Sequence, residues 1–200
     1  MFFKKKNLHL MICCAIFSVF FEENFASAAG DRVLVNIQKS AFSQRRLEAY
    51  IYVKRGIESQ GKAIEIGQKN WTELSDEFLN DMLIEMESMR LGGFKPAISA
   101  MKLANDNYEK RMAESQHMRE RMASLDVGHA ELQQIITTIL RVEAYKVSKG
   151  AVSELKKNEI MFVSNEAIAL TEWFAKLKSS SSIRWFANSD KYVAISPASR

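Results

Sequence analysis

Two residue types with metal-ligand chemistry stand three positions apart in Glu114-Ser115-Gln116-His117. In a helix this spacing puts a carboxylate and an imidazole on one face, as in di-metal carboxylate bundles, which also need a second Glu-x-x-His pair and two more acids. The only other histidine after residue 28 is His129, which follows Gly128 at a point where we expect no helix interior. We therefore expect Glu114 and His117 to face solvent, and we predict no metal and no other cofactor.

Methionines form a second group with ligand chemistry, since thioethers are soft ligands that select Cu(I). Met82, Met86 and Met89 follow one another at helical spacing. Further methionines stand at Met101, Met112, Met118 and Met122. Unbranched methionine side chains also fill gaps in cores and form adaptable surfaces. Because these positions fall on apolar stripes, core packing is the favoured interpretation, an adaptable docking surface is the second, and a copper site is the third.

Few residues of this sequence stand in a setting that would make them nucleophiles. Both cysteines, Cys13 and Cys14, lie inside an N-terminal apolar run, and no G-x-S-x-G or phosphate-binding glycine pattern occurs. Paired acids for glycoside hydrolysis need not be close in sequence, so an envelope-acting hydrolase stays open as the least supported alternative. We expect that the chain is not an enzyme.

The C-terminal segment carries the residues that we predict to bind a partner. Two short extended stretches, 183–187 and 191–195, follow the serine run 179–182 and are separated by a turn at 188–190. The candidate partner-binding residues are Trp185, Phe186, Tyr192, Val193 and Ile195. This stretch is too short to form a core of its own. Either it folds back over the helices, or it binds a partner by adding a strand to a sheet edge.

Apolar residues at spacings of three and four predict the helices that would position these groups. Only two prolines occur, Pro96 and Pro197, and Pro96 suits the first position of a helix. Thr72 or Ser75 are the candidate N-caps of the helix that ends at Gly92-Gly93. The expected helices span 47–71, 71–89, 97–125, 132–149 and 160–177.

The N-terminal part of the folded region is ambiguous, because Val33-Leu34-Val35 and 50–53 are rich in residues that also suit strands. The recurrence of Tyr50, Ile57, Ile64 and Trp71 every seven residues favours one long helix, bent or broken at a glycine. The predicted fold is therefore all-α: an elongated antiparallel bundle of four to five helices with coiled-coil-like packing, plus a short extended C-terminal segment.

Residues 1–28 have the pattern of a secretory signal peptide. Lys4-Lys5-Lys6 precede an apolar run from Leu8 to Phe21, and small residues follow at Ala26 and Ala28. The run of 14 residues is short for a bilayer span, which takes about 20. We expect cleavage after Ala28 or Ala29, with retention as a membrane anchor as the alternative. The predicted divisions are the signal peptide 1–28, the helical domain 29–178 and the C-terminal segment 179–200.

Cleavage would remove both cysteines and lower the formal net charge from +4 to +3. Charges of both signs alternate along the chain, which excludes nucleic acid as the expected partner, although a basic exported protein is attracted to anionic envelope surfaces. We expect an exported protein, periplasmic or extracellular, that binds other proteins and self-associates through its helices. It would contact a membrane only through an uncleaved signal segment.

These features predict a non-catalytic subunit or accessory of a cell-envelope or secretion assembly, such as a conjugation or type IV-like system. The alternative is a periplasmic holdase chaperone with methionine-rich client-binding surfaces.

Overall fold

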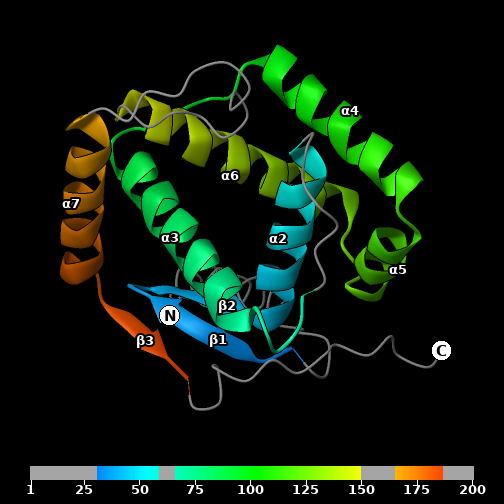
Figure 1. Cartoon of the computed structure of the whole chain (residues 1–200), viewed down its shortest axis with the longest axis horizontal. Helices are drawn as coiled ribbons and strands as arrows, with labels where there is room; N and C mark the ends of the chain where they lie inside the picture. Colours follow the sequence, from blue (N-terminus) through cyan, green and yellow to red (C-terminus); the bar gives the residue numbers. More distant parts are fainter. Residues whose placement is uncertain (1–30, 59–65, 150–164, 187–200) are drawn as a thin grey trace, which may run out of the picture. The chain divides into compact units, whose positions relative to one another are not determined.

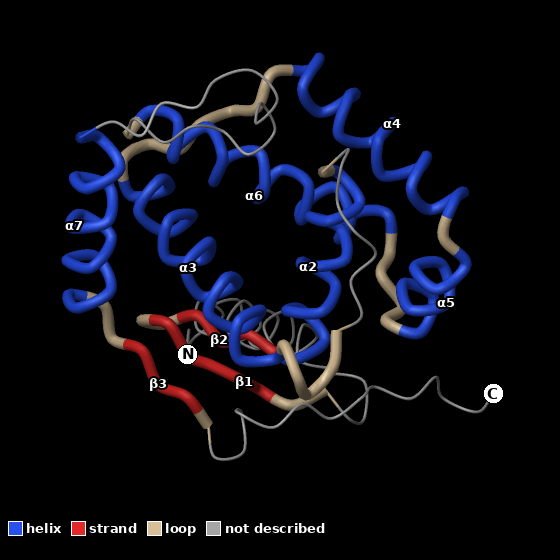
Figure 2. The backbone as a smooth tube through the Cα atoms, viewed as in Figure 1, coloured by secondary structure: helices blue, strands red, loops and turns tan. Residues whose placement is uncertain are grey.

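A computed structural model describes residues 31–58, 66–149 and 165–186, with the backbone alone for 165–171. The chain divides into two compact units, Met1–Arg32 and Val33–Arg200, and the described helices and strands lie in the second. In the described residues this unit is mostly helical, with one small sheet of three strands (Figures 1 and 2). The prediction of an all-α protein is therefore correct in outline. Antiparallel coiled-coil-like packing is not confirmed and stays a prediction.

The first element is a strand, where the sequence predicted helix. β1 (Val33–Ile37) and β2 (Ser40–Ser43) form an antiparallel hairpin in which Val35 pairs with Phe42. The connection is the two-residue turn Gln38-Lys39, in which Gln38 has a φ of 54°. β-Branched residues fit a pleated, half-buried surface well. This local preference, together with a tight turn, forms the hairpin in place of a helix.

Helix α2 (Gln44–Ile57) begins where the hairpin ends, and the Ser43 hydroxyl caps it by accepting a hydrogen bond from the Arg46 N–H. The seven-residue recurrence holds within α2 for Tyr50 and Ile57, but α2 does not continue to Trp71. A continuous helix over 47–71 is therefore wrong; α2 ends at Ile57, next to Gly56, one of the glycines in the predicted helix. α2 is buried on most of its surface, because four helices pack against it: α3 (Trp71–Arg90), α4 (Ile98–Glu114), α5 (Gln116–Ser124) and α6 (His129–Ser148).

Gly56, near the C-terminal end of α2, lets neighbouring side chains approach the α2 backbone closely. A Cβ atom at this position would lie 2.7 Å from Met118 Cε and 2.8 Å from Tyr108 Cδ2. The glycine predicted to weaken the helix is thus the point at which side chains from α4 (Ile98–Glu114) and α5 (Gln116–Ser124) meet the α2 backbone.

Helix α3 (Trp71–Arg90) confirms the predicted helix and its stop at Gly92-Gly93. Both glycines have positive φ angles, and the Gly93 N–H donates to Ser88 O (2.8 Å) while the Gly92 N–H donates to Met89 O (3.1 Å). This pair of bonds is the Schellman ending. The predicted N-caps Thr72 and Ser75 are wrong, because Asn70 holds the cap position and its side chain binds the Gly67 N–H instead.

The predicted helix 97–125 is two helices in the structure, because the helical conformation is interrupted at Ser115. This residue ends α4 with an extended backbone, and its hydroxyl then caps α5 by accepting from the Met118 N–H at 3.2 Å. A serine that binds a nearby backbone N–H favours a cap over a helix interior. The next helix, α6 (His129–Ser148), agrees with the predicted helix over 132–149.

Helix α7 (Asn165–Ser180) covers the described part of the predicted helix 160–177, and residues 160–164 lie outside the described residues. β3 (Ile183–Trp185) follows and pairs antiparallel with β1, which gives the strand order β2-β1-β3. The first predicted C-terminal stretch, 183–187, is thus extended over Ile183–Trp185. The second, 191–195, lies outside the described residues.

One hydrophobic cluster joins the hairpin to helices α2 to α6, with Phe174, Leu177 and Ile183 packed on its margin. Trp71, Tyr50 and Phe78 are its largest fully buried side chains. A smaller cluster of Ile84, Val142 and Tyr145 lies against the α7 side chains Trp173 and Phe174. The core therefore positions α3 and α6 side by side, with α7 against α3.

Candidate functional site

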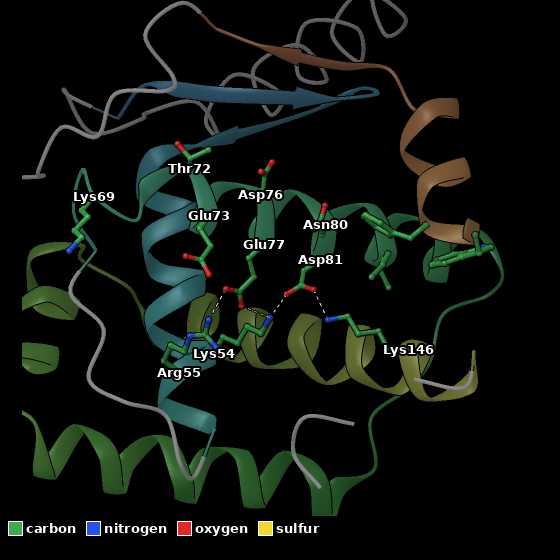
Figure 3. A pocket seen from close by; sticks show the side chains of 13 residues that line it. Lys54, Arg55, Lys69, Thr72, Glu73, Asp76, Glu77, Asn80, Asp81 and Lys146 are labelled. Carbon is green, nitrogen blue, oxygen red and sulfur yellow. Dashed lines mark hydrogen bonds and ion pairs between the residues drawn. The ribbon is translucent and has the colours of Figure 1, made fainter. Parts of the chain in front are cut away.

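A group of buried charged side chains links α2, α3 and α6 (Figure 3). Asp81 on α3 is 2% exposed and accepts hydrogen bonds from Lys54 Nζ at 2.6 Å and Lys146 Nζ at 2.8 Å. The buried Tyr50 hydroxyl donates to the same carboxylate at 3.0 Å. Three elements distant in sequence therefore meet at one carboxylate.

A second carboxylate extends this network toward solvent. Glu77, one helical turn before Asp81, lies 2.7 Å from Lys54 Nζ and accepts from Arg55 Nη2 at 2.7 Å. Lys146 also contacts Glu143 at 3.2 Å. We call these side chains the ion-pair network: Tyr50, Lys54, Arg55, Glu77, Asp81, Glu143 and Lys146.

The network holds each central group in its ordinary charge state. Burial by itself would lower the pKa of Lys54, but Asp81 and Glu77 outweigh burial and raise it. Burial by itself would raise the pKa of Asp81, but the two ammonium groups outweigh it and lower the pKa. Burial and the Asp81 carboxylate both raise the pKa of Tyr50 well above its usual value. Near neutral pH, Lys54 is therefore cationic, Asp81 anionic and Tyr50 neutral.

These charge states decide what chemistry the network offers. A general acid or base works best when its pKa lies near the working pH, and a nucleophilic lysine needs a lowered pKa. The pKa shifts at Lys54 and Asp81 run the opposite way. The arrangement is suited to holding three helices together and to presenting a fixed pattern of charge.

Five side chains of the ion-pair network form the floor of an open cleft of about 1130 Å³: Lys54, Arg55, Glu77, Asp81 and Lys146. α7 supplies an apolar wall through Trp173 and Phe174, together with Ile84 of α3. Trp173 stands 5.6 Å from the Tyr145 ring between centroids. The remaining polar lining residues are Lys69, Thr72, Glu73, Asp76 and Asn80. The cleft therefore joins aromatic surface to charged groups, as ligand sites commonly do.

The mouth of the cleft differs from its floor. Glu73 and Asp76 are exposed, and Asp76 meets Lys178 of α7 at only 4.0 Å, with both side chains largely exposed. Figure 3 shows Glu77 and Asp81 pointing toward Lys54 and Lys146, whereas Asp76 projects from the other side of α3. The carboxylates at the mouth are therefore exposed, Asp76 with one long ion pair at 4.0 Å, while Glu77 and Asp81 on the floor are paired with lysines at 2.6–2.8 Å.

Of the partner-binding residues predicted from the sequence, the two that the structure describes, Trp185 and Phe186, do not line the cleft. Trp185 is on β3, opposite Val35 of β1, and is 38% exposed. Phe186 follows it, half-buried, and its N–H donates to Leu34 O at 3.2 Å. Tyr192, Val193 and Ile195 lie outside the described residues. Residues 183–186 are thus folded back on β1, and a role of Trp185 in binding stays a prediction.

The remaining candidates from the sequence are the Glu114–His117 pair and the methionines. Glu114 and His117 are both exposed, as expected, and the described residues hold no cluster of three potential metal ligands. Met82, Met118 and Met122 are buried, which confirms core packing for them. Of the methionines in the described residues, only Met89 is exposed, at 54%.

Sequence reasoning missed the ion-pair network. Lys54 interrupts the apolar run Tyr50–Val53, and Asp81 directly precedes Met82 on a buried face. A charged residue on an apolar helix face is rarely fully buried unless it is paired. A charged residue at such a position therefore indicates a buried ion pair, although the pattern does not identify the partners.

Comparison with family models, curated proteins and solved structures found no match for this chain. No helix in the described residues is long and apolar enough to cross a membrane.

Proposed function

We propose that this protein is an exported, non-catalytic interaction protein that serves as a subunit or accessory of a cell-envelope or secretion assembly. The cleft between α2, α3, α6 and α7 is its binding site for a segment of a partner protein. Export rests on the signal-peptide pattern of residues 1–28.

The observation that carries the proposal is the division of the cleft into a paired floor and an exposed mouth. Lys54 and Lys146 both bind Asp81, so a ligand that forms ion pairs with these side chains competes with existing ones. The aromatic wall at Trp173 and the exposed carboxylates Glu73 and Asp76, the latter in a 4.0 Å ion pair with Lys178, line the mouth. A partner segment with an apolar side chain next to a lysine or arginine complements both features.

A second contact is proposed at β3. In the described residues β3 is an outer strand of the sheet, and Trp185 is partly exposed on it. Adding a partner strand to such an edge is a common mode of peptide recognition. The holdase alternative has less support, because the described methionines other than Met89 are buried or half-buried.

The experiment is recovery of partners from a detergent extract of the cell envelope by the tagged exported protein. We expect a defined partner in fixed stoichiometry, whose recovery falls at least about tenfold for Glu73→Lys/Asp76→Lys, since opposed like charges weaken association. The matched control is Asp106→Lys/Glu109→Lys, which reverses two exposed acids of α4. Equal recovery by the cleft variant and wild type would contradict the proposed site.

A separate assay addresses catalysis. The wild-type protein is incubated with isolated envelope polymer, and the release of soluble fragments is measured. We expect no release above buffer. Release that one acid substitution abolishes would favour the hydrolase alternative and count against the proposal.

A further inference from the structure

The large apolar side chains that remain exposed gather in one stretch of the described chain. Five of them fall between residues 89 and 103, within the end of α3, the connection and the first turns of α4. They are Met89, Leu91, Phe94, Ile98 and Leu103, with exposed fractions of 54, 56, 39, 89 and 61%. Exposed apolar side chains that are grouped together commonly belong to a site of protein or membrane contact. We call residues 89–103 the 89–103 surface.

The charge of this stretch has one sign. Between Glu87 and Asp106 the sequence contains three cationic residues, Arg90, Lys95 and Lys102, and no acid. All three are exposed; Arg90 is bound to Glu87 at 2.7 Å, whereas Lys95 and Lys102 form no ion pair with another described residue. Apolar and basic side chains therefore alternate over 15 residues, in contrast to the mixed charges elsewhere.

Contacts with α6 hold the connection in place. The Phe94 ring meets the Tyr145 ring edge-on, with centroids 5.9 Å apart, and Phe94 O accepts from Arg141 Nε at 3.0 Å. Arg141 is in turn paired with Glu85 of α3. The last turns of α6 add Val147, 49% exposed, and Lys149, whose ammonium lies 5.4 Å from the Tyr145 centroid. The side chains of the 89–103 surface are thus presented on a braced support.

We propose that the 89–103 surface binds the headgroup layer of an anionic membrane. Interfacial binding requires apolar side chains that enter the boundary between headgroups and acyl chains, with lysines or arginines beside them to meet anionic lipids. Leu91, Phe94 and Ile98 supply the first requirement, and Lys95 and Lys102 supply the second. The lack of acids favours an anionic lipid surface over a protein partner of mixed charge. Such binding would hold the exported protein at the envelope, independently of the cleft.

The test measures co-sedimentation of the exported, processed protein with vesicles. The probes are vesicles of phosphatidylcholine with about 30% phosphatidylglycerol, and vesicles of phosphatidylcholine alone. We expect at least about tenfold tighter binding to the anionic vesicles and weakening by salt, because each lysine near the surface contributes electrostatic attraction.

Two variants separate the requirements, and circular dichroism checks that each remains folded. Lys95→Glu/Lys102→Glu removes the attraction, and Leu91→Ser/Ile98→Ser removes the inserted side chains; each should weaken binding at least about tenfold. The matched control is Lys39→Glu/Lys110→Glu, two exposed lysines elsewhere, which should bind within about twofold of wild type.

Three outcomes would overturn the inference. The first is that wild type does not bind anionic vesicles, and the second is that the two 89–103 variants bind them as tightly as wild type does. The third is that the control Lys39→Glu/Lys110→Glu loses as much binding as the 89–103 variants. Loss of a protein partner by the 89–103 variants with vesicle binding unchanged would assign the surface to a protein instead. The cleft variant Glu73→Lys/Asp76→Lys should bind vesicles at least as well as wild type, so this inference and the proposed function can fail separately.

Discussion

Replacing Asp81 with alanine tests the ion-pair network at its centre. The side chain is 2% exposed and binds Lys54, Lys146 and Tyr50. Its removal leaves two ammonium groups and a hydroxyl facing a small cavity. Lys54 keeps Glu77 at 2.7 Å and Lys146 keeps Glu143 at 3.2 Å, so neither cation is left without a carboxylate.

The expected loss follows from the burial of these groups. Removing one partner of a buried ion pair costs about 3–5 kcal/mol. Lys54, Lys146 and Tyr50 all lose a partner here, and Glu77 and Glu143 compensate the two remaining charges only in part. A domain of this size has a total stability of roughly 5–15 kcal/mol. We therefore expect Asp81→Ala to lower the free energy of unfolding by about 3–5 kcal/mol and to leave a folded but weakened protein.

Urea unfolding followed by tryptophan fluorescence provides the assay, because Trp71 is fully buried at the start of α3. With an m value of about 2 kcal/mol per M, the expected loss moves the unfolding midpoint down by roughly 1.5–2.5 M. The control Asp76→Ala removes an exposed acid of the same helix and should change stability by less than about 0.5 kcal/mol.

A third variant identifies the cause of the loss. The triple variant Lys54→Met/Asp81→Leu/Lys146→Met removes all three charges at once. Replacing a whole buried ion pair by apolar residues is often neutral or stabilising. We expect this variant to regain at least half of the stability lost in Asp81→Ala. An Asp81→Ala midpoint within about 0.25 M of wild type, at unchanged m, would refute the reasoning.

Three further predictions concern packing and pH. Gly56→Ala should cost about 1–3 kcal/mol in urea unfolding, because its Cβ would lie 2.8 Å from the Tyr108 ring, whereas Gly67→Ala has open space and should cost less than about 0.5 kcal/mol. Ile139→Asp should abolish the folded circular dichroism spectrum at 25 °C, since this side chain is 3% exposed and a buried unpaired charge costs several kcal/mol; a folded variant would contradict the core described for α6. The lowered pKa of Asp81 means that its stabilisation is complete above its unfolded pKa of about 3.9 and is lost as the pH falls through the lower folded value. Stability measured from pH 5 to 3 should therefore fall less steeply in Asp81→Asn than in wild type, and equal slopes would contradict it.

The helices that the sequence predicted well are those with a single apolar face. Trp71, Leu74 and Phe78 on α3, and Ile135 and Ile139 on α6, recur at spacings of three and four and are all buried. Apolar periodicity is a direct consequence of packing one helix face against a core, so it can be read from the sequence without knowing the rest of the fold. The break at Ser115 leaves the apolar spacing on either side intact and is set by one hydroxyl.

The hairpin and the ion-pair network were missed for different reasons. Val33-Leu34-Val35 suits either element, and the seven-residue recurrence that favoured helix reflects burial of α2 and the start of α3 separately. Asp81 lies 27 residues from Lys54 and 65 from Lys146, so their meeting depends on how three helices pack. The cleft likewise needs α7 beside α3, a contact that no local pattern encodes.

The most direct test of the proposed function is site-specific photo-crosslinking in the producing cell. A photoreactive phenylalanine analogue replaces Trp173 in the aromatic wall of the cleft and, in a control, Lys110 on the exposed face of α4. We predict one discrete adduct with a cell-envelope protein from position 173 and none from position 110, and we expect Glu73→Lys/Asp76→Lys to abolish the adduct. Absence of any adduct at position 173, or the same adduct from both positions, would contradict a partner-binding role for the cleft.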